Sequence, residues 1–500
     1  MSIATAVLAG LLAAGAQAQE TPAAAAQSTM SFRIGAEPLL SAIMTIAEER
    51  IRGTYGTVRL LAATDEVLSG KWDNMRELFQ TAAGTLNGVL WYVRPDGVYF
   101  TADKGLMARK VNDRFYFPRL MEGEPVVGEL VISRTTSRPA AVVAVPVKKN
   151  KKVIGAVGVS LFLDEIARLV DEKTDLPRDA VFYAVDSKGR SALHRDRRFM
   201  FGFPAMEGSP SLAAAIAEMF SRKAGTVRYD FKGQSKTVVF KESRMTGWCF
   251  ALGQQVPIPG AAIRTREQAQ GALDSIRKAL DALLARMDAG LQSAAEEVAK
   301  SGIGPAAREA VRRLCREHPE ATDCAVVDDK GTMQVVEPSD YSIFEGVFIG
   351  QQEQVLRLQN TKQPVLSRVF RSVEGTDAVD FERPVLTPEG KFAGSVSILF
   401  RPEFLLLTTI AGAVETSDAE VWAVQKDGTA LYDTEKGAAR KAIFDALGPR
   451  IAEEETGSGT YFILSKDGRA LRKEALWTSV SRYGTAWRLL VTRTMEAGEK

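Results

Sequence analysis

The sequence predicts an α+β fold of two tandem units, each with a long N-terminal helix followed by two small antiparallel sheets. Three observations lead to this prediction. Two long stretches repeat apolar residues at steps of three and four, each is followed by strand-rich text, and the two strand-rich parts resemble each other. A chain of 500 residues is too long for one ordinary domain, and a duplicated unit accounts for that length.

The two long helices are predicted from the spacing of their apolar residues. Steps of three and four place side chains on one face of an α-helix. In the first stretch these residues are Leu40, Ile43, Ala47, Ile51, Tyr55, Val58 and Ala62. In the second they are Leu273, Ile276, Leu280, Leu283, Met287, Leu291 and Val298. We expect each helix to bury this face against the strands that follow it.

The strand-rich parts match each other over long segments. "GEPVVGELVISRTTSRPAAVVAVPVKKNKKVIGAVGVSLFLDEI" is paralleled by "KQPVLSRVFRSVEGTDAVDFERPVLTPEGKFAGSVSILFRPEFL". Their prolines and glycines fall at nearly equal spacing, with Pro125, Pro146 and Gly155 opposite Pro364, Pro384 and Gly394. Further on, "VFYAVDSKGRSALHRD" parallels "VWAVQKDGTALYDTEK". Short apolar runs joined by polar, glycine-containing turns are typical of antiparallel strands.

The repeat also indicates where the units begin and end. We expect a first unit at residues 35–255 and a second at 263–495. The segment 256–262, "VPIPGAA", contains two prolines and a glycine and is predicted to be the linker between them. Each unit should contain two modules, at about residues 65–170 and 175–255 in the first and about 320–408 and 415–495 in the second.

The N-terminus predicts export. The segment from Ile3 to Ala14 is apolar, and Ala16-Gln17-Ala18 is a small-x-small cleavage pattern, so residues 1–18 read as a secretory signal peptide. No Lys or Arg precedes the apolar run, which leaves an uncleaved anchor as the alternative. The composition of residues 19–34 predicts a flexible leader. We therefore expect a periplasmic or secreted protein, cleaved near Ala18.

Composition and motifs argue against several functions. The formal net charge is only +2, with Lys and Arg spread along the chain, so we expect no nucleic-acid partner. The two histidines, His194 and His318, fall in different units, which leaves no His-pair metal site and no His-based triad within one module. No nucleophile elbow or phosphate-binding loop is present either. We expect no catalytic residue, no metal and no cofactor, and hence no enzyme.

Three cysteines occur in the chain, Cys249, Cys315 and Cys324. An oxidising compartment would permit a disulfide between Cys315, near a predicted helix end, and Cys324, at the start of a predicted strand. The alternative is three buried thiols that pack as small apolar groups.

The order of these features resembles the double Cache (dCache) extracellular sensor domains. The residues that carry the resemblance are the long first helix, "NDRFYF", "GELVISRTTSRPAAVVAVPV", the turn "KKNKKVIGAVGVSL" and "VFYAVDSKGRSALH". The second unit, with "EPSDYSIFEGVFIGQQEQV" and "PVLSRVFRSVEG", is similar but more divergent. The resemblance implies a distal and a proximal PAS-like module in each unit, with the ligand in the distal one.

The same resemblance implies a site in the first unit. In the family, the Arg-x-aromatic-aromatic segment lines the distal pocket, which corresponds here to Arg114, Tyr116 and Phe117. A guanidinium offers a planar fork of donors to a carboxylate, and aromatic walls exclude water. Hydroxyl contacts are expected from the following strand, at Ser133, Thr135 and Thr136. The alternative is that Arg114 pairs with Asp113 or Glu122 at the surface.

One difference from the family restricts the class of ligand that we expect. Amino-acid-binding Cache domains carry an Asp on the strand after the glycine turn, where this chain has Ser160. A pocket with an arginine but no such carboxylate should prefer an organic acid to an amino acid. We therefore expect a sensor of a small carboxylate that relays to a membrane receptor, kinase or transporter. A solute-binding protein for a transporter, or a structural spacer without ligand, are the alternatives.

Overall fold

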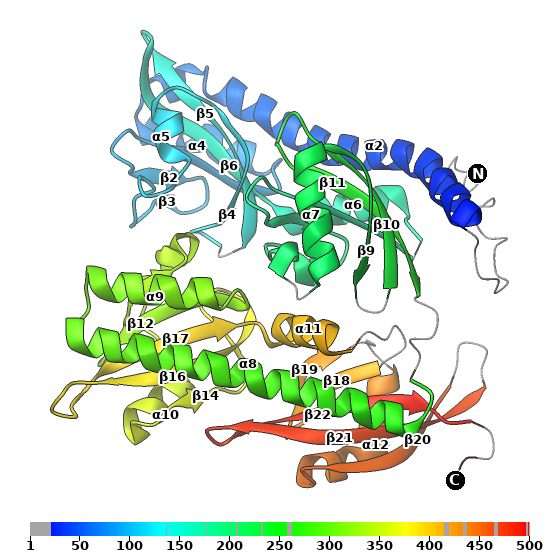
Figure 1. Ribbon diagram of the computed structural model, residues 1–500. Coiled ribbons are helices and arrows are strands. Elements are labelled where there is room, and N and C mark those ends of the chain that lie inside the picture. Colours follow the sequence, from blue (N-terminus) through cyan, green and yellow to red (C-terminus); the bar gives the residue numbers. More distant parts are fainter. Residues whose placement is uncertain are drawn as a thin grey trace. The chain divides into compact units, whose positions relative to one another are not determined.

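The computed structural model describes residues 22–136, 138–177, 179–206, 209–231, 234–257, 263–414, 420–433, 438–464, 469–496 and 499. Within them the chain divides into two compact units, one made of most of residues 22–256 and the other containing the described residues from 257 onward (Figure 1). The predicted signal peptide, residues 1–18, and residues 258–262 of the predicted linker lie outside the described part of the chain.

Helix α2 (Pro22–Leu61) opens the first unit and buries the predicted apolar face. It packs against helix α6 (Leu163–Thr174) and against strands β5 (Pro139–Lys149) and β6 (Lys152–Phe162). Residues 22–34 belong to this helix, where composition had predicted a flexible leader. That segment is rich in alanine, which has the highest helix propensity, so the same composition also favours a helix.

The distal module of the first unit is a six-stranded antiparallel sheet in the order β3-β2-β1-β6-β5-β4. Alternate residues of a strand face opposite sides of the sheet. Leu90 and Tyr92 pack on the side of α2, whereas Trp91 and Val93 pack on the side of α5. The remaining elements are α3 (Asp65–Leu68), α4 (Trp72–Ala83), α5 (Phe117–Met121), β1 (Gly88–Val93), β2 (Tyr99–Thr101), β3 (Gly105–Leu106) and β4 (Val126–Ile132).

The proximal module of the first unit is a five-stranded antiparallel sheet in the order β8-β7-β11-β10-β9. Two hydrogen bonds tie it to the distal module: Trp248 Nε1 donates to Gly128 O at 2.9 Å and Arg190 Nη2 donates to Leu130 O at 3.0 Å. Its elements are β7 (Ala180–Val185), β8 (Ser191–His194), η1 (Arg197–Phe199), η2 (Pro204–Met206), α7 (Pro210–Arg222), β9 (Ala224–Phe231), β10 (Gln234–Glu242) and β11 (Cys249–Pro257).

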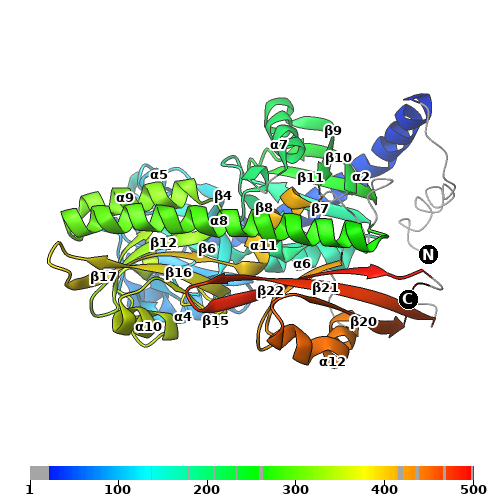
Figure 2. The same ribbon diagram turned by 60° about the horizontal axis from the view of Figure 1, so that its bottom comes forward.

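The second unit repeats this plan. Helix α8 (Arg266–Ser301) begins at a capping box formed by Thr265 and Gln268, and all seven predicted apolar residues are buried. Figure 2 shows α8 running along both sheets of the unit, where it packs against β16, β17, β21 and β22. Helix α9 (Pro305–Glu317) packs beside α8.

The two sheets of the second unit are again antiparallel. The distal sheet has the order β13-β12-β17-β16-β14, with β15 paired to β16, and the proximal sheet has the order β19-β18-β22-β21-β20. The distal elements are β12 (Ala321–Asp328), β13 (Met333–Glu337), η3 (Ser339–Phe344), α10 (Glu353–Thr361), β14 (Val365–Leu366), β15 (Phe370–Arg371), β16 (Asp377–Leu386), β17 (Phe392–Phe400) and α11 (Pro402–Ala413). The proximal elements are β18 (Glu420–Gln425), β19 (Ala430–Asp433), α12 (Ala438–Glu453), β20 (Gly457–Leu464), β21 (Ala470–Arg482) and β22 (Thr485–Thr494).

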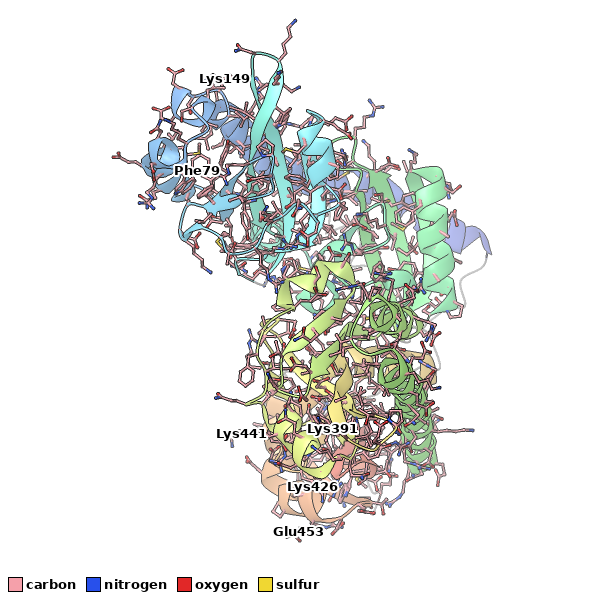
Figure 3. The ribbon with its side chains drawn as sticks, turned by 90° about the vertical axis from the view of Figure 1, so that its left-hand side faces the viewer. Phe79, Lys149, Lys391, Lys426, Lys441 and Glu453 are labelled. Carbon is pink, nitrogen blue, oxygen red and sulfur yellow. The ribbon has the colours of Figure 1, made fainter. Side chains whose placement is uncertain are left out.

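The hairpins β5–β6 and β16–β17 occupy equivalent positions in the two distal sheets. Figure 3 labels Lys149 and Lys391, which are exposed at the turns of these hairpins, and Phe79, which α4 buries in the core. The predicted fold class is confirmed: each unit has a long N-terminal helix and two antiparallel sheets.

Candidate functional site

A small cavity opens in the distal module of the first unit, on the side of the sheet that faces away from α2. Its volume is about 30 Å³, which is enough for a few water-sized groups. The lining combines arginine, hydroxyl and aromatic side chains with a few aliphatic ones. These residues are Trp91, Tyr99, Val111, Arg114, Tyr116, Val131, Ile132, Ser133, Arg134, Thr135 and Ser160.

Arg114 is held in this lining by local backbone turns. Its N–H donates to Val111 O at 3.0 Å, and its carbonyl accepts from Phe117 N at 2.8 Å. The side chain is only 5 % exposed, and Nη2 donates to Ile132 O, at the end of β4, at 2.7 Å. The alternative of a surface pair with Asp113 or Glu122 does not fit, because Arg114 is buried.

Trp91 and Tyr116 form the aromatic wall. Their ring centroids lie 6.4 Å apart with an interplanar angle of 29°. The Trp91 ring lies over Gly158, its cross-strand neighbour on β6, where an added Cβ would come within 2.3 Å of the ring. Trp91 Nε1 donates to Ser160 Oγ at 3.2 Å. A glycine is therefore needed at position 158 for the indole to lie flat on the strand and reach the serine.

Arg134 is a second cation in the lining, which sequence reasoning missed. Its side chain is only 7 % exposed, and it pairs with Asp113 and donates to Lys110 O. Its Nε has no hydrogen-bond partner among the described residues. The signal was present in the sequence, since Arg134 stands directly between Ser133 and Thr135, two residues that we had predicted to contact a ligand.

Two buried tyrosines complete the polar lining. Burial raises the pKa of Tyr116, against the opposing effect of the positive charges of Arg114 and Arg134. Burial likewise raises the pKa of Tyr99, and Arg134 and a hydrogen bond with Thr135 oppose it. Both phenols therefore keep their protons at neutral pH and are hydrogen-bond donors.

The structure brings five of the seven predicted contact residues together. Arg114, Tyr116, Ser133, Thr135 and Ser160 line the cavity. Phe117 and Thr136 do not: Phe117 is 8 % exposed and packs in the core with Leu120, and Thr136 is exposed. Phe117 is the first residue of α5, and the helical turn directs its side chain away from that of Tyr116.

Cys249, Cys315 and Cys324 are free thiols in the structure, which is the alternative to a Cys315–Cys324 disulfide. Cys315 Sγ lies 3.2 Å from Glu337 O, and burial raises the pKa of the Cys324 thiol. The disulfide stays a prediction for thiol titration.

A larger hollow lies in the second unit, between the start of α8 and strands β20 and β21. It measures about 650 Å³ but is wide open and lined by charged and polar side chains. Arg266, one of them, is 56 % exposed and pairs with Glu474. A wide, exposed and mostly polar hollow encloses little of a small molecule, so the smaller buried cavities are the better candidates.

Comparison with known families identifies one segment of the chain. Residues 282–402, which include the whole distal sheet of the second unit, match the model of the family described as "HK/GC/Chemotaxis protein-like, sensor domain". A search of curated proteins finds no match. Among the described helices, none is both long enough and apolar enough to cross a membrane.

Solved structures of extracellular sensor domains are similar to parts of the chain. An extracellular ligand-binding receptor from Desulfohalobium retbaense matches at 30 % identity and a TM-score of 0.40, over 51 % of this chain and 45 % of that one. The ligand-binding domain of the Pseudomonas aeruginosa chemoreceptor PctB, in complex with L-Arg, matches at 16 % identity and a TM-score of 0.37, over 46 % and 97 %. The V. cholerae histidine kinase DctB sensor domain matches at 11 % identity and a TM-score of 0.38, over 46 % and 99 %.

Proposed function

We propose that this chain, whose residues 282–402 belong to the HK/GC/chemotaxis protein-like sensor domains, is an exported sensor that binds a small carboxylate in the distal module of its first unit. The observation that carries the proposal is the composition of the cavity lining. It holds two arginines, Arg114 and Arg134, and no Asp or Glu among its described residues.

The polar groups of the cavity lining are available to donate hydrogen bonds. The two phenols of Tyr99 and Tyr116 keep their protons, and both guanidinium groups are donors only. Ser160 Oγ already accepts from Trp91 Nε1, which leaves the serine hydroxyl its proton to donate. A wall of donors and positive charge stabilises an anion, and an arginine fork matches the two oxygens of a carboxylate.

Because no Asp or Glu lines the cavity among its described residues, the site should prefer a plain organic acid to an amino acid. An α-ammonium group placed here would meet two arginines and lose its hydration without a carboxylate partner. Several similar structures are complexes with amino acids, among them PctB with L-Arg and the Pseudomonas fluorescens chemoreceptor CtaA with L-alanine. An amino acid is therefore the competing ligand that the experiment must include.

The test is calorimetry with three probes of equal carbon number: propionate, L-alanine and 1-aminopropane. We expect propionate to bind the mature chain more tightly than L-alanine. Arg114→Ala should weaken propionate binding by roughly 2–5 kcal/mol, the usual cost of removing one partner of a desolvated charge pair. At about 1.4 kcal/mol per factor of ten, that is roughly 30- to 4,000-fold. Arg114→Lys should also weaken binding, because an ammonium cannot form the bidentate fork.

Arg119→Ala is the matched control. Arg119 lies on α5, close to Arg114 in sequence, but its side chain is 46 % exposed and pairs with Glu129 at 3.1 Å, outside the cavity. It should bind propionate like the wild type. Equal propionate affinity in wild type and folded Arg114→Ala would refute the proposal, as would tighter binding of L-alanine than of propionate.

Export and relay are further parts of the proposal. The signal-peptide pattern supports a mature chain that starts near Gln19 in the periplasm, and N-terminal sequencing of periplasmic protein tests it. A membrane receptor, kinase or transporter would receive the signal. A transporter as the only partner recovered by cross-linking would favour the solute-binding alternative, and a chain that binds no small molecule would favour the structural spacer.

A further inference from the structure

The distal sheet of the second unit carries a cluster of acids on one face. Asp323 on β12 and Asp380 on β16 are both cross-strand partners of Leu399 on β17, so the three residues form one row. Glu382 follows two residues after Asp380 and therefore points to the same side. Glu374, in the turn before β16, lines the same cavity as Asp323 and Asp380.

These four side chains are buried, with exposed fractions of 1 % for Asp323, 3 % for Glu374, 4 % for Asp380 and 0 % for Glu382. Each has a carboxyl oxygen that accepts no hydrogen bond from the described residues: Asp323 Oδ2, Glu374 Oε1, Asp380 Oδ1 and Glu382 Oε1. Buried acceptors without a partner are rare in folded proteins and costly. Asp380 and Glu382 can share a proton with each other, but Asp323 and Glu374 have no such acid partner, and these two call for a ligand that supplies donors and positive charge.

The equivalent row in the first unit is not acidic. Gly155 and Gly394 are equivalent by the repeat, and Ser160 and Leu399 each follow five residues later. Ser160 pairs with Val89 on one side and Val142 on the other, where Leu399 pairs with Asp323 and Asp380. The same three strands thus carry valines in one unit and carboxyls in the other, so the acids are not a requirement of the fold.

The cavity over this row measures about 20 Å³ and has no Lys, Arg or His in its described lining. Three carboxyl side chains stand among hydroxyl, amide and apolar ones, including the ring of Phe370 and the side chains of Met333, Ile349 and Leu399. No three described His, Cys, Asp or Glu side chains are arranged to hold a metal ion. Carboxyls beside an aromatic and aliphatic wall fit an organic cation, whose charge meets the acids and whose carbons meet the wall.

We infer that the distal module of the second unit binds a small protonated amine that carries no carboxylate, through Asp323, Asp380 and Glu374. This site is separate from the carboxylate site of the first unit and does not rest on it. An amino acid is excluded from it by repulsion, since its carboxylate would meet three acids and no cation. The two units would then bind ligands of opposite charge.

The electrostatics of the cluster agree with this inference. Burial raises the pKa of all four carboxyls, and the neighbouring acids add to the effect on Asp323 and Asp380. Six other titratable or charged side chains are near the cluster but do not line the cavity as described: Cys315, Cys324, Tyr341, Glu353, Arg357 and Arg401. An ammonium ion favours the ionised acids, so its binding should release protons, and its affinity should rise as the pH rises through the raised pKa values of these carboxyls.

The test uses the full mature chain and the same three-carbon probes. We expect 1-aminopropane to bind the wild type with an affinity that L-alanine and propionate do not reach at this site. Asp323→Asn and Asp380→Asn should each weaken its binding on the order of tenfold or more, because each removes a charge from the cluster without changing its shape. Asp377→Asn is the control, since Asp377 lies on the same strand but is 72 % exposed and pairs with Arg371.

This design can refute each of the two proposed sites without affecting the other. Arg114→Ala should leave 1-aminopropane binding unchanged, and Asp323→Asn should leave propionate binding unchanged. The amine site is refuted if the wild type does not bind 1-aminopropane, if L-alanine competes with it equally, or if Ca²⁺ binds there in its place. The relative affinities of the wild type for the three probes test the amine site even if a variant does not fold.

Discussion

Asp380→Asn should make the ligand-free protein more stable at neutral pH. Asp380 is 4 % exposed, and its carboxyl is next to that of Glu382, which is fully buried. Burial and these like charges raise the pKa of Asp380. The folded protein therefore holds a proton that the unfolded chain releases above about pH 4. The stability that this proton provides is complete below that pH and is lost as the pH rises through the raised pKa of the folded state.

Asparagine has the same shape, carries no charge, and can donate its amide N–H to Glu382. Removing one unsatisfied buried acceptor of this kind is worth about 1–3 kcal/mol. A gain of about 2 kcal/mol in a unit of this size raises the Tm by roughly 4–8 °C. The gain should be present near pH 8 and absent near pH 4, where both acids are protonated in the wild type.

Differential scanning calorimetry of the wild type, Asp380→Asn and the Asp377→Asn control, at several values of pH without ligand, measures this effect. The control should follow the wild type throughout, because Asp377 is exposed. If Asp380→Asn lowers the Tm at pH 8, or if its difference from the wild type does not change with pH, Asp380 is not a strained buried acid. The proposed cation site would then lose its energetic basis.

Three further predictions concern single positions. Gly158→Ala should destabilise the first unit by about 1–3 kcal/mol and weaken propionate binding, because the new Cβ would displace the Trp91 ring; unchanged melting and binding would show that the indole moves freely. Ser160→Asp should lower the affinity for propionate and raise that for L-alanine, since it places a carboxylate beside Arg114 and Arg134; calorimetry with both probes checks this, and an unchanged preference would exclude Ser160 from ligand contact. Thiol titration of denatured protein purified without reductant should count three thiols if the cysteines stay free, as in the structure; a count of one would show a disulfide, and peptide mapping would test whether it joins Cys315 to Cys324.

The fold could be predicted from the sequence because its signals are local. A helix such as α8 repeats its apolar residues every three or four positions, and most neighbouring strands in each sheet are consecutive in the chain. The duplication added a second, independent copy of the same pattern. Composition alone misled at residues 22–34, where an alanine-rich stretch is equally compatible with a leader and with a helix.

The carboxylate site could be predicted only in part. Arg114, Tyr116 and Ser160 were found through a motif and a strand position, but Phe117 was placed in the cavity and Arg134 was missed. Which side of α5 a ring takes, and whether an arginine turns inward or into solvent, depends on packing between segments that are distant in the chain. The residues adjacent to a side chain in the sequence do not indicate which residues face it across the cavity.

The sequence by itself determined the repeated α+β plan and the position of an arginine beside aromatic residues. Only the tertiary structure decided that Asp323, Glu374 and Asp380 meet in one buried cavity. Asp323 and Asp380 stand on strands that are not consecutive, and the register of both against Leu399 on β17 brings them into one row. The β16–β17 hairpin sets the register of Asp380, but β12 pairs with a strand that is distant in the chain, and there a shift of one residue would turn Asp323 to the opposite face of the sheet. That pairing forms only when the sheet assembles, so the local sequence of β12 does not reveal it.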